Sequence, residues 1–277
     1  MADQPTVMKF GGTSVEDARA FARVARIVGA RAQEEERPVV VVSAMSRVTD
    51  ALLASVDTAS TGDADGALRS LEEHFERHML VARVLPAGAR DELFLELELA
   101  RRALGELLRR VASDGEPRRP LQDQILSYGE CLSAKLLAAV LAERALPSAY
   151  VDARRCIITD DAHGSATPAN DETYEHTRAE LSPLLAAGRI PVLGGYIGST
   201  ADGRTTTLGR GGSDYTAALV GASIGAREIQ IWTDVNGVLT ADPRVVPHAR
   251  TIPNLSFAEA AELAYFGAKV LHPKTIL

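Results

Sequence analysis

The fold is decided by the first 42 residues, in which Thr6-Val-Met-Lys-Phe10 runs directly into Gly11-Gly12 and Pro38-Val-Val-Val-Val42 follows later. The first run predicts a short strand that ends in a glycine turn. Residues 17–36 place apolar side chains at helical spacing and predict an amphipathic helix. The run of valines is typical of a strand buried on both faces of a parallel sheet. The opening therefore predicts a βαβ unit.

The same alternation continues along most of the chain. Further strands are expected at 148–151, 189–193 and 228–232, and further helices at 47–60, 121–145, 213–225 and 256–266. Residues 66–113 carry two leucine-rich stripes separated by Pro86 and Gly88, which predicts an inserted helical hairpin. We therefore expect an α/β fold, a three-layer α/β/α sandwich with a mostly parallel central sheet and a helical insertion near residues 62–118. A division of the chain is expected near residue 200, within the loop-rich stretch 195–210.

The composition is that of an ordinary globular protein. Of the 277 residues, 46% are apolar and 24% charged, and the net charge is −7 with a pI near 5.5. An acidic chain without a basic face argues against nucleic-acid binding. Two scattered cysteines, Cys131 and Cys156, do not make a disulfide scaffold and indicate a reducing compartment. With no basic leader and no run of roughly eighteen apolar residues, we expect a cytoplasmic protein without signal peptide or membrane span.

Lys9-Phe-Gly-Gly-Thr-Ser14 is the first of four segments that carry chemistry. A lysine at a strand end, two glycines and a following helix N-terminus together suit an anion. The segment matches neither the P-loop pattern nor the dinucleotide fingerprint. A glycine turn beside a surface lysine is the alternative interpretation.

Leu208-Gly-Arg-Gly-Gly-Ser-Asp214 is the second segment. Arg210 can hold a carboxylate or phosphate through two hydrogen bonds, and the glycines allow a phosphate to approach the backbone. The alternative is that Ser213 or Asp214 caps the following helix, and for Ser213 alone capping is the favoured interpretation.

The third and fourth segments are weaker signals. Trp232-Thr-Asp-Val-Asn-Gly-Val-Leu-Thr-Ala-Asp-Pro-Arg244 can place Val238 or Leu239 against a flat ring and Arg244 near phosphate, but composition alone favours a surface loop. Ser127-Tyr-Gly-Glu130 places a glycine in a predicted helix, where it costs about 1 kcal/mol and so indicates a close approach. Glu130 can hold an ammonium group, although a solvated glutamate is the simpler interpretation.

Metal-ligand patterns are poor. His74 and His78 lie four residues apart on a predicted helix, but no third zinc ligand is evident. Asp160-Asp161 is read equally well as part of a loop. We therefore expect no metal site built from protein ligands.

Taken together, these segments resemble the aspartate kinases of the amino-acid kinase family. They occur in that family's order and span nearly the whole chain. Acetylglutamate, uridylate and carbamate kinases have a similar glycine start but lack the Thr-Ser-Val continuation, the second segment and the helical insertion. The matching pieces are Lys9-Phe-Gly-Gly-Thr-Ser-Val15, Val42-Ser-Ala-Met-Ser-Arg-Val-Thr49, Ser127-Tyr-Gly-Glu130, Gly194-Gly-Tyr-Ile-Gly198, Leu208-Gly-Arg-Gly-Gly-Ser-Asp214, Trp232-Thr-Asp-Val-Asn-Gly237, Ala241-Asp-Pro-Arg244 and Leu263-Ala-Tyr-Phe-Gly-Ala-Lys-Val-Leu-His-Pro273.

The resemblance implies that MgATP phosphorylates the side-chain carboxylate of L-aspartate to 4-phospho-L-aspartate, the first step toward lysine, threonine and methionine. The residues fit this chemistry. A carboxylate with a pKa near 3.9 is already ionised at neutral pH and needs no general base. The barrier is the meeting of two anions, so positioned cations and backbone dipoles are the expected catalytic groups.

The resemblance also implies roles for single residues. Lys9 would stabilise the transferring phosphoryl group and Asp214 would orient Lys9. Arg210 would hold the substrate α-carboxylate and Glu130 its ammonium, and Mg²⁺ would be held mainly by the phosphates of ATP. The implied aspartate pocket comprises Ser43, Thr49, Glu130, Arg210, Gly211, Gly212 and Ser213. The implied ATP site comprises Lys9, Gly11, Gly12, Thr13, Ser14, Thr233, Asp234, Leu239, Arg244 and Lys269.

Domain organisation follows from the same resemblance. One catalytic domain would cover 1–277, with an aspartate-binding lobe at 1–200 and a nucleotide-binding lobe at 201–277. Relatives continue beyond the position of Leu277, so we expect the second lobe to be incomplete and the regulatory ACT domains to be absent. The expected partners are L-aspartate and ATP, with a homodimer as one possible assembly.

One substitution and one alternative function remain. Leu239 stands where many relatives have an aromatic residue, which weakens a stacking contact with the nucleotide. The alternative function is a truncated, non-catalytic kinase-like domain that binds nucleotide or aspartate. The retained Lys9, Arg210, Asp214 and Lys269 favour the enzyme.

Overall fold

The computed structural model describes residues 4–34, 37–113, 115–235, 237–242 and 245–265. Its centre is a sheet of five strands, and all four neighbouring pairs are parallel. The carboxyl ends of these strands lie along one edge of the sheet, where open α/β folds bind their ligands. The strand order is β3 (Ser148–Val151), β5 (Ile190–Gly194), β2 (Pro38–Val42), β1 (Thr6–Phe10) and β8 (Glu228–Trp232).

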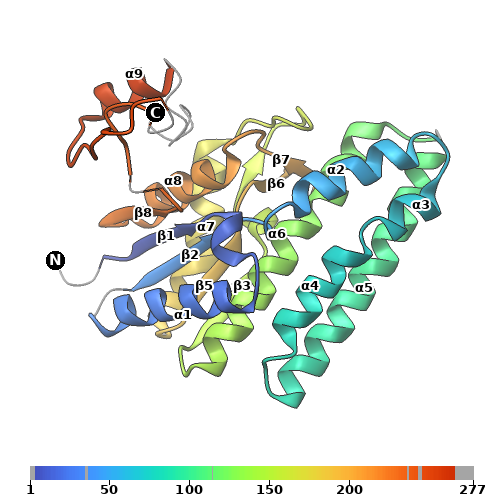
Figure 1. Ribbon diagram of the computed structural model, residues 1–277, viewed down its shortest axis with the longest axis horizontal. Coiled ribbons are helices and arrows are strands. Elements are labelled where there is room, and N and C mark those ends of the chain that lie inside the picture. The colour runs from blue at the N-terminus through green and yellow to red at the C-terminus, as the bar shows by residue number, and fades with distance from the viewer. Residues whose placement is uncertain (1–3, 35–36, 114, 236, 243–244, 266–277) are drawn as a thin grey trace.

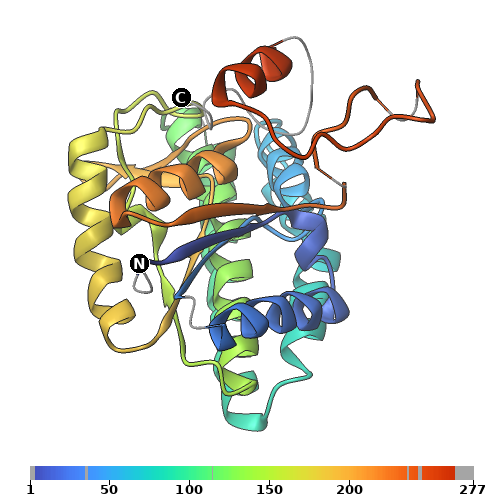
Figure 2. The ribbon, with the colours of Figure 1, turned by 90° about the vertical axis from the view of Figure 1, so that its left-hand side faces the viewer.

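The valines of β2 are buried on both faces of the sheet, as their sequence predicts. Val40 and Val42 belong to one core and Val39 and Val41 to the other, because side chains along a strand point to alternate faces. Figures 1 and 2 show a helical layer on each face of the sheet, which confirms the α/β/α sandwich. The layers are α1 (Ala18–Gln33) with α6 (Arg118–Glu143) on one face, and α7 (Asn170–Ala186) with α8 (Gly212–Ile224) on the other.

The helix boundaries have local causes. α1 begins after Asp17, whose side chain accepts a hydrogen bond from the backbone N–H of Ala20 at 2.8 Å. α8 ends at Gly225, whose φ of 61° is left-handed and favours glycine. The predicted helix at 256–266 begins with the expected capping box, in which Ser256 and Glu259 exchange hydrogen bonds. The described part of that helix is α9 (Phe257–Tyr265).

The predicted helical insertion forms a layer beside the sandwich (Figure 1). Between residues 62 and 118 the structure has three helices, because a short break at Ser70–Leu71 divides the first predicted stripe. Leu93, Leu97 and Leu104 of the second stripe are buried in the core that α6 shares. The helices of this layer are α2 (Val48–Ala59), α3 (Ala64–Arg69), α4 (Glu72–Ala82) and α5 (Ala87–Ala112).

Two features were not expected from the sequence. The first is α7, which carries Pro183 inside it. The second is a small three-stranded sheet, partly within a stretch expected to be loops. Its strands have two to four residues, which is too short for an alternating pattern to be recognised. They are β4 (Ile158–Thr159), β6 (Ile197–Thr200) and β7 (Thr205–Thr207), with β6 and β7 antiparallel.

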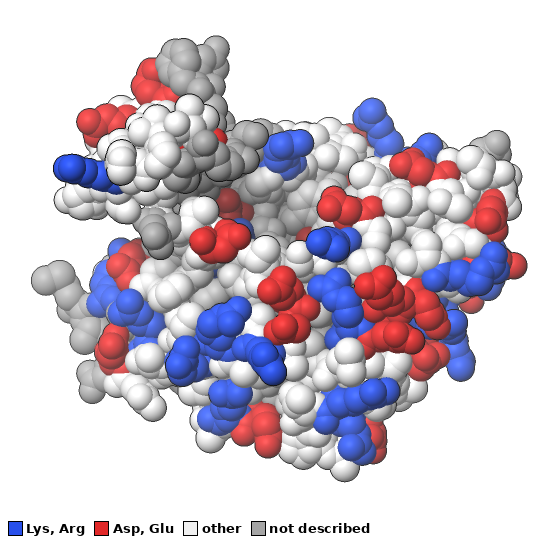
Figure 3. Space-filling model, viewed as in Figure 1, with Lys and Arg blue, Asp and Glu red and all other residues white. Residues whose placement is uncertain are grey.

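α6 is the one helix in the described residues that is long and apolar enough to cross a membrane. Within its most apolar window, 78% is buried inside the protein. A helix surrounded by its own protein is apolar on all sides, so burial accounts for its composition. Over the face seen in Figure 3, acidic and basic side chains are interspersed.

Candidate active site

A cleft of about 420 Å³ lies beyond the carboxyl ends of the central strands. It brings together the two implied catalytic residues and every implied residue of the aspartate pocket. They come from β1, from the loop after β2, from the start of α2, from α6 and from the turn into α8 with its first residues, and these segments are far apart in the sequence. The lining residues are Lys9, Ser43, Thr49, Glu130, Tyr196, Gly209, Arg210, Gly211, Gly212, Ser213 and Asp214.

Lys9 and Asp214 form an ion pair in this cleft. The Lys9 Nζ lies 2.7 Å from Asp214 Oδ1, and the two side chains are only 12% and 14% exposed. Lys9 is the last residue but one of β1, and Asp214 lies in the first turn of α8, where a carboxylate is favoured by the helix dipole. The sequence alternative of a surface lysine beside a glycine turn is therefore wrong.

The loop before α8 depends on glycine. Gly209 and Gly211 have φ of 78° and 72°, which side-chain-bearing residues rarely adopt. A Cβ on Gly212 would lie 2.9 Å from the ring of Tyr196. The backbone of this loop is thus held close to the cleft, with Arg210 exposed at its mouth and free of ion pairs within the described residues.

The capping interpretation of Ser213 and Asp214 is wrong. The residue at the N-cap of α8 is Gly211, and no side chain caps the helix. Ser213 and Asp214 lie inside the first turn and contribute to the cleft. A Cβ on Gly195 would lie 2.7 Å from the Ser213 Cα, so the turn after β5 packs directly against this helix start.

Glu130 is buried in the middle of α6, with 3% of its surface exposed, so it is not a solvated glutamate. Its Oε1 accepts one long hydrogen bond from the Ala44 N–H at 3.4 Å, and its Oε2 has no partner among the described residues. Burial raises the pKa of this carboxyl from its ordinary 4.5 to about 8. A buried carboxylate without a cation is suited to receive one from a ligand.

Gly129 explains how Glu130 reaches the cleft. A Cβ at this position would lie 2.9 Å from the Ala44 Cβ and 3.4 Å from Val48 and Leu52 side-chain carbons. The close approach that the helical glycine predicts is therefore the contact between α6 and the loop after β2. A Cβ on Gly194 would likewise lie 2.8 Å from the Glu130 Cβ.

Two loops meet beside Lys9. We name two segments by the roles that the resemblance implies. Residues 11–17 are the phosphate-side loop, and residues 43–49, which include the first two residues of α2, are the aspartate-side loop. The Ser46 N–H donates to the Gly12 carbonyl at 3.1 Å, and a Cβ on Gly12 would lie 2.8 Å from the Ala44 carbonyl. Gly12, Thr13 and Ser14 form a single 3₁₀ turn after β1. The two loops are thus in direct backbone contact.

Three of the implied nucleotide residues, Thr233, Asp234 and Leu239, do not line this cleft. Thr233 and Asp234 follow β8, are exposed and hydrogen-bond to each other at 3.1 Å. Leu239 is half-buried and pairs by a β-bridge with Thr251. Trp232 stacks on Phe10 with ring centres 5.9 Å apart, which joins the ends of β8 and β1. Arg244 and Lys269 lie outside the described residues.

The sequence reasoning did not assign Tyr196 to the site. This residue has a φ of 69°, lines the cleft and donates its backbone N–H to the Thr216 Oγ1 at 3.0 Å. Burial raises the pKa of its phenol. The segment Gly194–Gly198 was noted in the sequence, but a positive φ at a tyrosine has no sequence signal.

The reasoning also missed a buried carboxylate behind the cleft. Asp123 lies on α6 two turns before Glu130 and is fully buried. It accepts hydrogen bonds from Thr207 Oγ1 at 2.7 Å, from His163 Nδ1 at 2.9 Å and from the Gly164 N–H at 3.0 Å. Thr207 directly precedes the Leu208–Asp214 loop, so Asp123 anchors that loop to the helix that carries Glu130.

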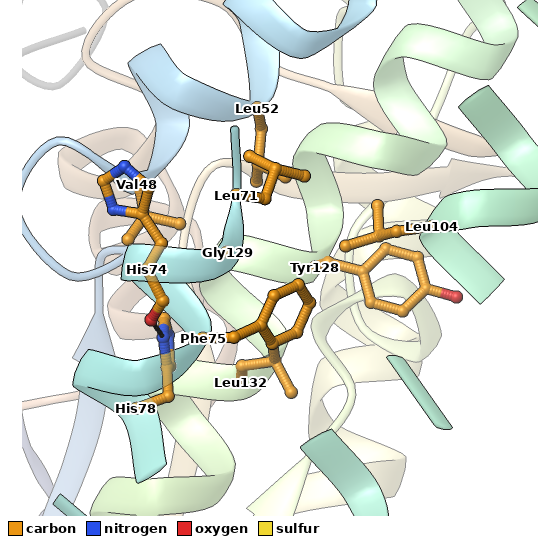
Figure 4. A pocket seen from close by; sticks show the side chains of 10 residues that line it. All are labelled: Val48, Leu52, Leu71, His74, Phe75, His78, Leu104, Tyr128, Gly129 and Leu132. Atoms are coloured by element: carbon orange, nitrogen blue, oxygen red, sulfur yellow. Dashed lines mark hydrogen bonds between the residues drawn. The ribbon is translucent and has the colours of Figure 1, made fainter. Parts of the chain in front are cut away.

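His74 and His78 do not form a metal site with a third ligand in the described part of the chain. They line a separate cavity of about 20 Å³ between α4 and α6 (Figure 4). The His78 Nδ1 donates to the His74 carbonyl at 2.6 Å, so its Nε2 is unprotonated. Burial lowers the pKa of His78 to about 4. It is a neutral core histidine.

Comparison with known proteins agrees with this fold. The profile of the "Amino acid kinase family" matches residues 4–277. The chain is 40% identical over 271 residues to lysine-sensitive aspartokinase 3 of Escherichia coli K12, covering 98% of this chain and 58% of the relative. It is 39% identical over 278 residues to chloroplastic aspartokinase 2 of Arabidopsis thaliana, covering 96% and 48%.

A solved structure gives the same result. Aspartokinase III of E. coli in complex with aspartate and ADP superposes with a TM-score of 0.88 at 38% identity, covering 99% of this chain and 59% of that one. The chain spans between 48% and 59% of the length of these relatives. The family profile covers nearly the whole chain, including the glycine turn after Lys9 and the Arg210 loop. The chain therefore belongs to the amino acid kinase family.

Proposed function

We propose that this chain is the catalytic part of an aspartate kinase, which phosphorylates the side-chain carboxylate of L-aspartate with MgATP to give 4-phospho-L-aspartate. The observation that carries the proposal is the charge arrangement in the cleft. Among the described residues, the buried carboxyl of Glu130 has no cation and Arg210 has no ion pair. Both face the same space as the Lys9–Asp214 pair. This arrangement suits a small amino acid with a second carboxylate.

Each group has a distinct task in this proposal. Glu130 receives the ammonium of aspartate, and Arg210 holds its α-carboxylate through paired hydrogen bonds. The side-chain carboxylate is then directed toward Lys9, whose charge offsets the negative charge that develops on the transferred phosphoryl group. Asp214 keeps the Lys9 ammonium in place. No general base is needed, because the attacking carboxylate is already ionised.

The nucleotide half of the proposal rests on the phosphate-side loop and on the relatives. Gly11, Gly12 and Thr13 follow Lys9 and offer backbone N–H groups of the kind that bind phosphate, whereas the Ser14 N–H donates to the Gly11 carbonyl at 3.0 Å and Ser14 offers its hydroxyl. The E. coli relative is described in complex with aspartate and ADP. Mg²⁺ is proposed to enter with ATP and to be held mainly by its phosphates. A cytoplasmic location and a homodimer are further parts of the proposal.

The decisive experiment measures MgATP-dependent acyl phosphate, trapped with hydroxylamine, with L-aspartate, L-glutamate and N-acetyl-L-glutamate in parallel. We expect product with L-aspartate alone, since N-acetylation removes the charge that Glu130 receives. Product with N-acetyl-L-glutamate and none with L-aspartate would contradict the proposal. No product with any substrate, together with calorimetric binding of ATP, would favour the non-catalytic binding domain.

A variant pair locates the substrate carboxylate. Arg210→Lys should lower kcat/KM for aspartate by about tenfold or more, because a lysine cannot reproduce a paired hydrogen-bond geometry. Arg204→Lys is the matched control, since Arg204 is exposed on the nearby β6–β7 turn and pairs with Asp202. An equal effect of both variants would contradict the role of Arg210.

A further inference from the structure

Arg77 connects the helical insertion to the phosphate-side and aspartate-side loops beside Lys9. It lies on α4, yet its Nη1 donates to the Ser46 carbonyl at 2.9 Å and its Nη2 donates to the Glu16 carbonyl at 3.0 Å. Ser46 belongs to the aspartate-side loop, and Glu16 to the phosphate-side loop. The two acceptors are thus 30 residues apart in sequence but are held by one planar guanidinium.

The two hydrogen bonds of Arg77 add a second connection between the phosphate-side and aspartate-side loops, which already contact each other directly. The first link is the hydrogen bond from the Ser46 N–H to the Gly12 carbonyl. Arg77 adds a connection through the carbonyl of the same serine. It does so at the wall of a second cleft, of about 780 Å³, which Glu16 and Arg47 also line. A single hydrogen bond between the loops leaves them free to pivot about it. A guanidinium that donates to both loops restrains the distance between them at a second point.

Arg77 is itself held in place. Its Nη1 lies 3.3 Å from the His74 Nδ1 one turn earlier, and because arginine only donates, His74 must accept. Burial and the neighbouring Arg77 lower the pKa of His74, which favours the neutral ring that can accept this hydrogen bond. Figure 4 shows Phe75 of the same helix pointing toward Leu132 of α6, and Phe75 is 7% exposed. The helix that carries Arg77 is therefore anchored in the core.

We propose that Arg77 is a positioning residue that sets the distance between the phosphate-side and aspartate-side loops, and hence the approach of the two substrates. The proposal rests on the proposed kinase function. Arg77 touches neither substrate in it. The helical insertion then contributes to catalysis, because its Arg77 holds together the two loops that bind the reacting groups.

The first test is kinetic. Arg77→Met keeps the apolar stem and removes the guanidinium, and we expect kcat/KM to fall by about 10- to 100-fold, since small displacements of reacting groups have effects of this size. Arg77→Lys should recover only part of the loss, because an ammonium presents no planar fork to two carbonyls. Guanidinium ion at about 20 mM should partly rescue Arg77→Ala relative to matched sodium chloride, an outcome that a general folding defect does not produce. The matched control is Arg83→Met, an exposed arginine at the end of the same helix.

The second test needs no activity. Hydrogen exchange should become faster in both segments 11–17 and 43–49 in Arg77→Met, and should be unchanged there in Arg83→Met. If the wild-type chain does not phosphorylate aspartate, the proposed function fails, whereas the exchange result still decides the role of Arg77. Unchanged exchange in either loop, or a kcat/KM within about twofold of wild type in an active enzyme, would overturn the proposal.

Discussion

The two charged regions of the cleft are built in opposite ways. At the end of β1, Lys9 lies 2.7 Å from Asp214, so its charge is balanced within the protein. In the middle of α6, Glu130 is almost fully buried and its Oε2 lacks a partner in the described residues. A balanced group can persist without ligand, but an unbalanced buried carboxylate is costly until a cation arrives. In the proposed function, one region is prepared in advance and the other is completed by the ammonium of the substrate.

The largest expected effect tests the balanced region. Lys9→Met should lower kcat by about 100- to 1000-fold, because it removes a cation that acts where charge develops in the transition state. The KM for aspartate should stay within about threefold, because Lys9 is not proposed to hold the ground-state amino acid. Steady-state kinetics with hydroxylamine trapping measures both constants.

Lys135→Met is the control for that variant, because Lys135 is also paired, with Glu96, but lines a different cavity. A large rise in the KM for aspartate with unchanged kcat in Lys9→Met would reverse the assignment. The lysine would then belong to substrate binding, and the contrast between the two regions would disappear.

The next largest expected effect is the dependence of aspartate affinity on pH, which tests the region around Glu130. Because the pKa of Glu130 is about 8 in the free protein, the carboxyl is protonated at lower pH and must lose its proton to receive an ammonium. The affinity for aspartate should therefore rise with pH, approaching tenfold per unit below pH 8, and level off above it. Glu130→Gln should abolish this dependence and weaken binding by about 10- to 100-fold.

Calorimetry in buffers of different ionisation enthalpy measures both the affinity and the released proton. Glu143→Gln, an exposed change at the end of the same helix, should leave the pH profile unchanged. An affinity that is flat between pH 6 and about 9 in the wild type would show that Glu130 is ionised without ligand. The two regions would then be alike.

The sequence predicts most of what depends on local pattern. The valines of β2 predict a strand buried on both faces, and Ser256 with Glu259 predicts a helix start, because each depends on neighbours within a few residues. The motifs around Lys9, Glu130 and Arg210 predict the cleft residues through their resemblance to a family. Their shared cleft is a property of the parallel strand ends, which the βαβ pattern indicates.

What the sequence does not predict depends on contacts between distant segments. Asp123 is one acidic residue in a helix, and nothing local shows that Thr207 and His163 will donate to it. Arg77 is one arginine in a charged helix, and its two carbonyl acceptors carry no side-chain signal at all. Conversely, a local rule favours Ser213 as the cap of the following helix, but the helix begins at Gly212 with Gly211 at its N-cap, so Ser213 lies inside the first turn.

The last expected effect is on stability, and it separates the folding role of Glu130 from its binding role. The pKa of Glu130 is raised in the folded protein, so the folded state keeps the proton that the unfolded chain loses above about pH 4.5. Its contribution to stability is fully present below that pH and is lost progressively as pH rises toward 8. Glu130→Gln cannot ionise, and its side-chain oxygen can still accept from the Ala44 N–H. The variant should therefore be more stable than wild type by about 4 kcal/mol at pH 8, but by only about 1 kcal/mol at pH 5.

Urea unfolding at both pH values, without ligand, measures this difference, with Glu143→Gln as the control. An aspartate concentration that saturates the wild type should then stabilise it more than it stabilises Glu130→Gln at pH 8, because only the wild type offers a carboxylate to the ammonium. A variant that is equally stabilised at pH 5 and pH 8 would mean that Glu130 destabilises the fold through packing rather than through its proton. A variant less stable than wild type at pH 8 would mean that the carboxylate is already balanced, and that the substrate does not complete this part of the cleft.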